Sequence, residues 1–179
     1  MNFPRILKKR KGYIDRIKPF MQKSVAKVLT GQRRVGKSFL LYQLIEEILA
    51  EEPDANIIYV NLEDFTFSSL QTAEDLHSYI ISHSKEKVKN YIFIDEIQDI
   101  PGFEKVIRSL LLNEDNDIYI TGSNAKMLSG ELATYLSGRY IEFKIYSLSY
   151  SEFLEFHGLT ESETSYELYS RYGGLPYLL

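Results

Sequence analysis

The sequence predicts an α/β fold with a mostly parallel sheet of five strands and helices on both faces. Short apolar runs alternate along the chain with segments of helical periodicity, which is typical of strand–helix–strand units. Most of these strands are apolar throughout, as expected of strands buried on both faces. A glycine-rich loop joins the first strand to the first helix. The 179 residues suit one such domain with a small appendage.

Five segments have the pattern of strands, and the last alternates in the manner of an edge strand. They are residues 25–30, 56–61, 91–94, 118–121 and 140–145. Helical periodicity is found at about 38–52, 72–88, 103–113 and 125–137. Ligands of parallel sheets bind at the carboxyl ends of strands. Since Gly31, Asp95 and Ser123 fall at such ends, we expect three distant stretches to converge on one site.

The glycine-rich loop has the complete pattern G-x-x-x-x-G-K-[ST]. Its glycines let the backbone bring N–H groups close to phosphate oxygens, and the N-terminus of the next helix adds a positive dipole. Lys37 is expected to reach the β- and γ-phosphates, and the Ser38 hydroxyl to ligate Mg²⁺. The fold is therefore predicted to be a P-loop NTPase three-layer sandwich; the family resemblance described below implies that this strand is central. The expected nucleotide-binding residues are Gly31, Gln32, Arg33, Arg34, Val35, Gly36, Lys37 and Ser38.

A second pair of residues indicates hydrolysis. Four apolar residues lead into Asp95 and Glu96, the form of a Walker B strand. Asp95 is expected to hold Mg²⁺ opposite Ser38, and Glu96 to polarise a water for in-line attack on the γ-phosphate. The alternative is a strand that simply ends in solvated acids. The N-K-x-D box that reads guanine is absent, which favours ATP, and we expect the adenine pocket around residues 13–17.

Two further catalytic candidates have structural alternatives that the sequence leaves open. Asn124 is the first candidate for orienting the attacking water and Ser123 is the second. Ser-Asn is, however, also a good N-cap for the following helix. Arg139 could stabilise transition-state charge, either in cis or from a neighbouring subunit of a homo-oligomer. It could equally pair with an acid at the start of the fifth strand.

Composition and charge limit the function classes. The chain lacks cysteine, its three histidines are scattered, and its apolar runs are too short to span a bilayer, so we expect a soluble cytoplasmic protein without a membrane partner. Residues 1–38 carry twelve Lys or Arg and one acid, Asp15, although the net charge is −4. This basic N-terminal arm could contact DNA. Alternatively, residues 33–37 serve the nucleotide and residues 8–11 form a solvated arm.

Past residue 146 the pattern changes to short capped helices. The boxes Ser149-x-x-Glu152 and Thr160-x-x-Glu163 predict helices over 150–157, ended by Gly158, and from Thr160 to about Tyr172. We therefore expect an ATPase core at residues 1–146 and a helical extension at 147–179. The apolar end of the chain suggests that this extension is the truncated start of a further C-terminal region.

Together these residues resemble a family of bacterial and archaeal ATPases in the AAA+-like branch of P-loop proteins. The matching motifs are Gly-Gln-Arg-Arg-Val-Gly-Lys-Ser, Phe-Ile-Asp-Glu-Ile-Gln, Thr-Gly-Ser-Asn, Leu-Ser-Gly-Arg, Ile-Tyr-Ser-Leu-Ser-Tyr-Ser-Glu-Phe and Arg-Tyr-Gly-Gly-Leu-Pro. The resemblance implies one extra strand between the P-loop strand and the Walker B strand, and residues 56–61 are assigned to it. It also implies a second domain after Gly-Gly-x-Pro, so the missing C-terminal region is an expected partner.

The sequence thus predicts an Mg²⁺-dependent ATPase that drives or gates a client. The alternative is a nucleotide-gated module that contacts DNA or a protein and hydrolyses ATP slowly or not at all. A small-molecule kinase is disfavoured by the Asp95-Glu96 pair.

Overall fold

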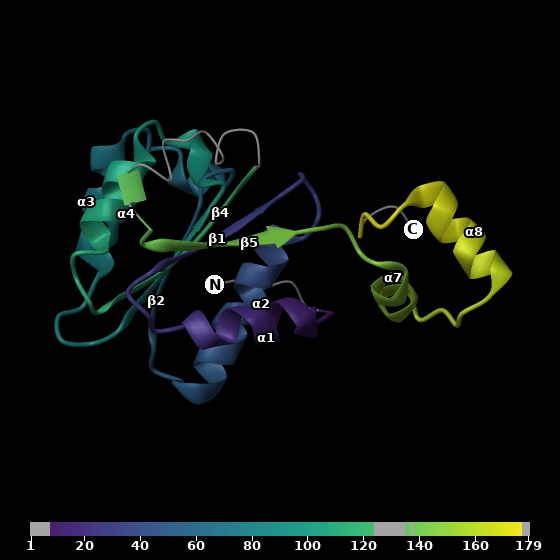
Figure 1. Cartoon of the computed structure of the whole chain (residues 1–179). Helices are drawn as coiled ribbons and strands as arrows, with labels where there is room; N and C mark the ends of the chain where they lie inside the picture. Colours follow the sequence, from purple (N-terminus) through teal and green to yellow (C-terminus); the bar gives the residue numbers. More distant parts are fainter. Residues whose placement is uncertain (1–7, 124–134, 137, 177–179) are drawn as a thin grey trace.

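A five-stranded sheet lies between two layers of helices (Figure 1) in the computed structural model, which describes residues 8–123, 135, 136 and 138–176. All strands are parallel, in the order β2-β3-β4-β1-β5. Their bounds are Ala26–Gly31 (β1), Asn56–Asn61 (β2), Asn90–Asp95 (β3), Asn116–Ser123 (β4) and Tyr140–Ile145 (β5). The predicted α/β sandwich is confirmed, and its sheet is parallel throughout.

The strand order corrects one detail of the prediction. An extra strand does separate β1 from β3, but it is β4, whereas residues 56–61 form β2 at the sheet edge. Burial explains the difference, because β4 is buried from Asn116 to Gly122 while β2 is buried only at Ile58 and Val60. β1 is an interior strand, one place from the middle of the sheet, and β5 forms the other edge as predicted.

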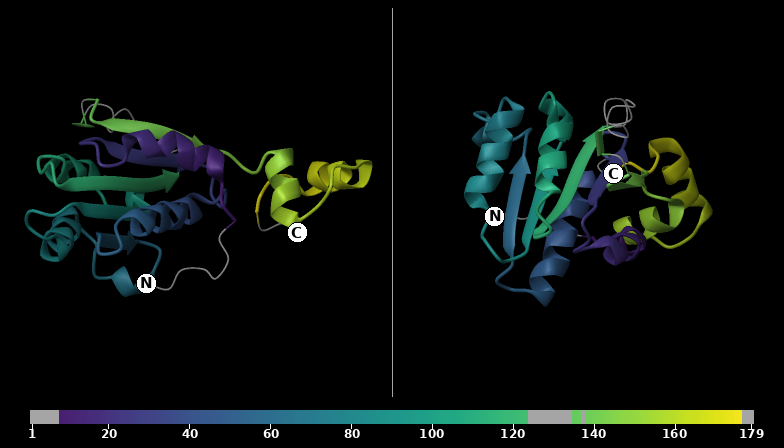
Figure 2. Two further views of the ribbon diagram at one scale, coloured as in Figure 1. Left: turned by 90° about the horizontal axis from the view of Figure 1, so that it is seen from below. Right: turned by 60° about the vertical axis from the view of Figure 1, so that its left-hand side comes forward.

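Helices cover both faces of the sheet (Figures 1 and 2). One face carries α1 (Lys11–Ile17) and α2 (Lys37–Glu51), and the other carries α3 (Ala73–His83) and α4 (Phe103–Leu110). Beyond β5, α7 (Tyr150–His157) and α8 (Glu163–Tyr172) form a separate pair beside the sheet. Short 3₁₀ helices are η1 (Lys18–Phe20), η2 (Phe65–Phe67) and η3 (Ile97–Asp99). None of the helices in the described part of the chain has the length and apolar character needed to cross a bilayer.

The continuous apolar strands divide their side chains between two cores. In β3, Ile92 and Ile94 pack toward α3 and α4, while Tyr91 and Phe93 pack toward α2. This follows from the period of two in a strand, which sends successive side chains to opposite faces. Phe93 also stacks on Tyr119 of β4 with ring centroids 4.5 Å apart. Both faces therefore exclude water, and polar chemistry is left to the strand ends.

Two helices differ from the sequence predictions: α3 is shorter than predicted, and α1 was not predicted. The helix predicted over 72–88 ends at His83, because the Asn90 carboxamide bonds both the N–H and the carbonyl of Lys85 and holds the next turn open. α1 was not predicted as a helix; its Ile14 and Ile17 are buried against α2. Most of the helix predicted over 125–137 lies outside the described residues.

The C-terminal helices begin at capping boxes, one of which the sequence placed wrongly. Ser149 and Glu152 form the predicted reciprocal box at α7, and Gly158 ends that helix in a left-handed conformation. The second box is made by Ser162 and Ser165 rather than by Thr160 and Glu163, so α8 begins later than predicted. Either hydroxyl residue is an acceptable N-cap by sequence, and only the chain path decides between them.

A buried ion pair joins β1 to β4 at the amino ends of these strands. The Lys27 ammonium contacts the Asp117 carboxylate, and both side chains are fully buried. Asp117 also accepts from the Gln22 N–H and the Tyr119 hydroxyl at 2.8 and 2.7 Å. The Lys27 ammonium further donates to the Val25 carbonyl at 3.0 Å. Polar groups this deep are tolerated because each has several partners.

Removing the carboxylate is expected to cost more stability than removing the ammonium. Asp117→Ala leaves a buried cation and two donors without an acceptor, so unfolding free energy should fall by about 3–5 kcal/mol. Lys27→Met leaves Asp117 with two donors and should cost less. Urea unfolding measures both, with Lys23→Ala, an exposed neighbour, as the control. Equal losses for the two variants would contradict this assignment.

Candidate functional site

The loop after β1 needs glycine at two points. A Cβ on Gly31 would lie 2.3 Å from the Ile145 carbonyl oxygen, so any side chain there would push β5 away from β1. Gly36 has φ +96° and is the N-cap of α2, a left-handed position that glycine adopts without strain. Arg34 is left-handed as well, with φ 68°. The loop thus turns sharply and leaves the backbone at the N-terminus of α2 facing the carboxyl ends of the strands.

The side chains of this loop divide into outward and inward groups. Gln32, Arg33 and Arg34 are exposed, and Arg33 pairs with Glu63 at 2.8 Å. Val35 is buried in the core beside α2. The sequence predicted that Gln32 to Val35 contact nucleotide; because their side chains are exposed or buried in the core, their backbone groups are left for such a contact.

Lys37 lies folded over the loop. Its side chain is 3% exposed, and its ammonium lies 3.3 Å from the carbonyl oxygens of both Gly31 and Gln32. The same nitrogen is 3.5 Å from Oε1 of Glu96. The first residue of α2 thus reaches across to the end of β3, and the two predicted motifs meet in space.

Asp95 ends β3 within a set of hydroxyl groups. Thr121 of β4 donates to Oδ1, and the Tyr59 hydroxyl of β2 lies 3.3 Å from Oδ2. The Ser38 hydroxyl also bonds this carboxylate. Burial raises the pKa of Asp95, although the bonds from Ser38 and Thr121 act in the opposite direction. The predicted neighbours Ser38 and Asp95 are therefore in contact.

Glu96 is the first residue after β3 and has a left-handed backbone, with φ 56° and ψ 47°. Its N–H donates to Thr121 Oγ1 at 2.9 Å, and its Oε2 accepts from Gln98 Nε2 at 2.6 Å. Sequence reasoning missed Tyr59, Gln98 and Thr121. Tyr59 and Thr121 carried a signal, since both are polar side chains near the carboxyl ends of strands, but their neighbours in the sheet were not known.

Of the remaining catalytic candidates, one lies outside the described residues and one is placed away from the loop. Asn124 is not described, and of Ser123 only the backbone is, in register with Gly31. Arg139 is exposed and precedes β5, where its carbonyl accepts from the Ala26 N–H. That is the amino end of the sheet, about 20 Å along the strands from Gly31. This distance disfavours the cis alternative for Arg139, while a role toward another subunit and a pairing with an acid near the start of β5 both stay predictions.

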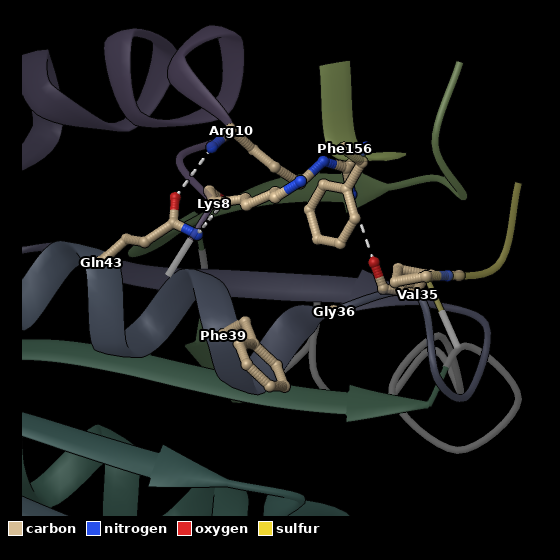
Figure 3. Close-up of a pocket in the computed structure, with 8 residues that line it drawn as sticks. Lys8, Arg10, Val35, Gly36, Phe39, Gln43 and Phe156 are labelled. Atoms are coloured by element: carbon tan, nitrogen blue, oxygen red, sulfur yellow. Dashed lines mark hydrogen bonds between the residues drawn. The ribbon is translucent and has the colours of Figure 1, made fainter. Parts of the chain in front are cut away.

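Arg10 joins four parts of the chain and was not singled out by the sequence. Its buried guanidinium makes a two-pronged pair with Glu152 of α7 at 2.9 and 3.0 Å. The guanidinium also donates to the Tyr146 carbonyl at 3.0 Å and to the Val35 carbonyl at 3.2 Å. The backbone N–H of Arg10 donates to Oε1 of Gln43 in α2 at 2.9 Å (Figure 3). The phosphate-loop backbone and the C-terminal helices are thus bonded to the same side chain.

Three other basic residues of the arm, Lys8, Lys9 and Lys18, also have partners within the chain. Lys9 and Lys18 both pair with Glu47, at 2.9 and 2.6 Å. The Lys8 ammonium lies 5.3 Å from the ring centroid of Phe156. With Arg10 paired to Glu152, the described part of the arm presents less free positive charge than its composition predicts.

A mostly apolar cavity of about 210 Å³ opens beside the loop (Figure 3). Its walls include Lys8, Val35, Gly36, Phe39, Phe156 and Pro176. The sequence placed a base pocket at residues 13–17, but Ile14 and Ile17 are core residues and the cavity lies nearer residue 8. Phe156 and Pro176 come from the C-terminal segment, which no spacing argument linked to the loop.

Comparison with known proteins identifies the family. The profile of the AAA domain family matches residues 23–154. The chain belongs to this family. An uncharacterized protein of Haemophilus influenzae is 41% identical over 93% of this chain, and one of Methanocaldococcus jannaschii is 37% identical over 73%. The chain spans 43% and 28% of the lengths of these two relatives.

Several solved structures share the fold of this chain. Aeropyrum pernix ORC1, solved in complex with DNA, has a TM-score of 0.58 at 14% identity, over 92% of this chain and 51% of its own. Aquifex aeolicus DnaA, bound to AMPPCP, has a TM-score of 0.54 at 15% identity, over 92% and 56%. Saccharomyces cerevisiae Hsp104, solved with casein, has a TM-score of 0.58 at 16% identity, over 93% and 33%. At these identities the likeness shows the shared fold.

The raised pKa of Asp95 predicts that this carboxylate lowers the stability of the AAA domain. The folded state holds the proton more tightly than the unfolded state, so the contribution of Asp95 is lost as pH rises through the folded pKa. At pH 7, Asp95→Asn should therefore be more stable than the wild type by about 1 kcal/mol, and the gain should shrink in acid. Thermal unfolding without nucleotide measures this. The exposed neighbour Asp99→Asn is the control, and a lower melting temperature for Asp95→Asn would refute the prediction.

Loss of Arg10 is expected to loosen α7 selectively. Burial alone would raise the pKa of Glu152, but bonds from Arg10 and Ser149 lower it overall. This stabilisation is therefore present at neutral pH and lost as pH falls through the folded pKa. Arg10→Ala should speed amide exchange in α7 about tenfold or more while α3 is unchanged. The exposed Lys9→Ala is the control, and unchanged exchange in α7 would show that the pair does not hold it.

Proposed function

We propose that this AAA domain binds Mg²⁺-ATP on residues 31–38 and hydrolyses it with Glu96 as the base. The observation that carries the proposal is the approach of the Lys37 ammonium to the Glu96 carboxylate at 3.5 Å, beside the glycine loop. The proposed phosphate-binding cation at the start of α2 thus lies beside the proposed water-activating carboxylate that follows β3. Membership of the AAA family and the AMPPCP-bound DnaA neighbour support a nucleotide as the ligand.

The phosphates are proposed to lie over the N-terminus of α2. The first N–H groups of a helix lack partners within it, and its dipole favours anions there. α2 has 15 residues and begins at Lys37 with no side-chain cap, so its N-terminus is not covered by a capping carboxylate. On binding, Lys37 would exchange its carbonyl contacts for the β- and γ-phosphates.

Ser38 and Asp95 fit a magnesium ion. Both offer oxygen, the ligand that Mg²⁺ prefers, and the two side chains already contact each other. Tyr59 and Thr121 donate to Asp95 and would keep its carboxylate aimed toward Ser38. When bound, Mg²⁺ would neutralise charge on the β- and γ-phosphate oxygens.

Glu96 is proposed to take a proton from the attacking water. As oxygen adds to the γ-phosphorus, the bond to the β–γ bridging oxygen breaks, and ADP and phosphate are the products. Asn124, or Ser123, remains a proposal for orienting this water. Arg139 is proposed to act on a neighbouring subunit's site, because its position before β5 faces away from its own loop.

The adenine base is proposed to occupy the cavity beside the loop. Phe39, Phe156 and Pro176 give it apolar walls, which suit a flat aromatic ring. Val35 and Gly36 form part of the same wall, so a base in the cavity would be continuous with phosphates on the loop. This position also links nucleotide binding to the C-terminal segment.

The client of the cycle is proposed to be reached through residues 147–179. We assign residues 1–146 to the ATPase core and 147–179 to a helical extension, which Arg10 bonds to the loop at Val35. This contact would let nucleotide binding alter the position of the extension. A contact with DNA through the basic arm, in a nucleotide-gated module, is the alternative; the ion pairs of Lys9, Arg10 and Lys18 weigh against it.

Two substitutions separate binding from hydrolysis. Lys37→Ala should abolish ATP binding, because the ammonium lies against the loop backbone where the phosphates are proposed to bind. Glu96→Gln should keep ATP binding and lower turnover by about 10²–10⁴-fold, since a general base contributes that much. Phosphate release and nucleotide affinity measure both, with the exposed Glu63→Gln as the matched control. Unchanged turnover in Glu96→Gln would remove Glu96 from the mechanism.

A further inference from the structure

Gln98 lies in η3, two residues after the proposed base. The left-handed backbone of Glu96 turns the chain sharply, and the Asp99 N–H closes the turn on the Glu96 carbonyl at 3.2 Å. This turn brings the Gln98 carboxamide back over the Glu96 side chain, where Nε2 donates to Oε2 at 2.6 Å. The Gln98 side chain thus donates a hydrogen bond to the Glu96 carboxylate from outside the glycine loop.

The two oxygens of Glu96 have donors of different kinds. Oε2 accepts from the Gln98 amide, whereas Oε1 faces the Lys37 ammonium at 3.5 Å. Lys37 belongs to the phosphate loop and would turn to the phosphates when ATP binds. Gln98 lies in η3, outside that loop, so its bond to Oε2 does not require Lys37 to stay in place.

We propose that Gln98 is a positioning residue that fixes the orientation of Glu96 for activation of water. The proposal rests on the proposed function, in which Glu96 is the base. Holding Oε2 sets the plane of the carboxylate and leaves Oε1 to accept a proton once Lys37 moves away. The amide of Gln98 supplies this bond from a neutral N–H donor. The Glu96 N–H bond to Thr121 at 2.9 Å fixes the backbone of the same residue.

The kinetic test compares Gln98→Met with Gln98→Glu in the same chain. Methionine has similar length and no donor, so hydrolysis of bound Mg²⁺-ATP should fall about 10–100-fold while affinity changes less than about twofold. An ionised Glu at position 98 repels Glu96, but a protonated one donates to it as the amide does. The rate of Gln98→Glu relative to wild type should therefore rise between about pH 8 and about pH 6, a trend that Gln98→Met should lack.

A second measurement tests the contact without turnover. The side-chain amide protons of Gln98, followed by NMR, should shift on Glu96→Ala both in the free chain and in the chain bound to Mg²⁺ and AMPPCP. Absence of that shift in the nucleotide-bound chain would overturn the proposal even if the chain does not hydrolyse ATP. Absence of turnover in wild type with the contact retained would instead count against the proposed function alone.

Four further results would also overturn the positioning role. Hydrolysis by Gln98→Met at the wild-type rate would show that Glu96 needs no such partner. A parallel loss of ATP affinity, or a melting temperature lowered by more than about 5 °C, would show that Gln98 only supports the fold. A pH dependence of Gln98→Glu that matches Gln98→Met would exclude the hydrogen bond as the cause.

Discussion

The placement of β4 between β1 and β3 is the constraint on which the site depends. It places the glycine loop two strand spacings, about 10 Å, from Asp95 and Glu96, with all of them at the carboxyl ends of the strands. Lys37 and Ser38, the first residues of α2, reach across this distance to Glu96 and Asp95. Thr121 of β4 contacts both acids: its hydroxyl donates to the Asp95 carboxylate and accepts from the backbone N–H of Glu96. The strand that separates the motifs therefore also connects them.

The two ends of this sheet use polar groups in opposite ways. At the amino end, Lys27 and Asp117 are fully buried and satisfied by each other and by neighbours, which suits a fixed structural pair. At the carboxyl end, Asp95 has a raised pKa because burial outweighs its hydrogen bonds. Carboxyl groups whose pKa is raised by burial occur frequently at functional sites.

The motifs could be predicted from sequence because their chemistry is local. The glycine loop and the pair Asp95-Glu96 each come at the end of an apolar strand, and the carboxyl ends of parallel strands all lie at the same end of the sheet. Long-range partners could not be predicted in this way. The strand order, which puts β2 at the edge and Arg139 at the far end, depends on how all five strands pack together. Arg10 looked like one cation of a basic arm, and its pairing with Glu152 requires the fold of residues some 140 positions apart.

The central claim is that the glycine loop and the two acids form one binding site for Mg²⁺-ATP, and calorimetric titration of the folded chain tests it most directly. Binding should be saturable, with one nucleotide per chain, and should weaken when Mg²⁺ is removed, because Ser38 and Asp95 would lose the ion between them and the phosphates. Absence of binding heat, together with no rise in melting temperature on adding Mg²⁺-ATP, would contradict the claim.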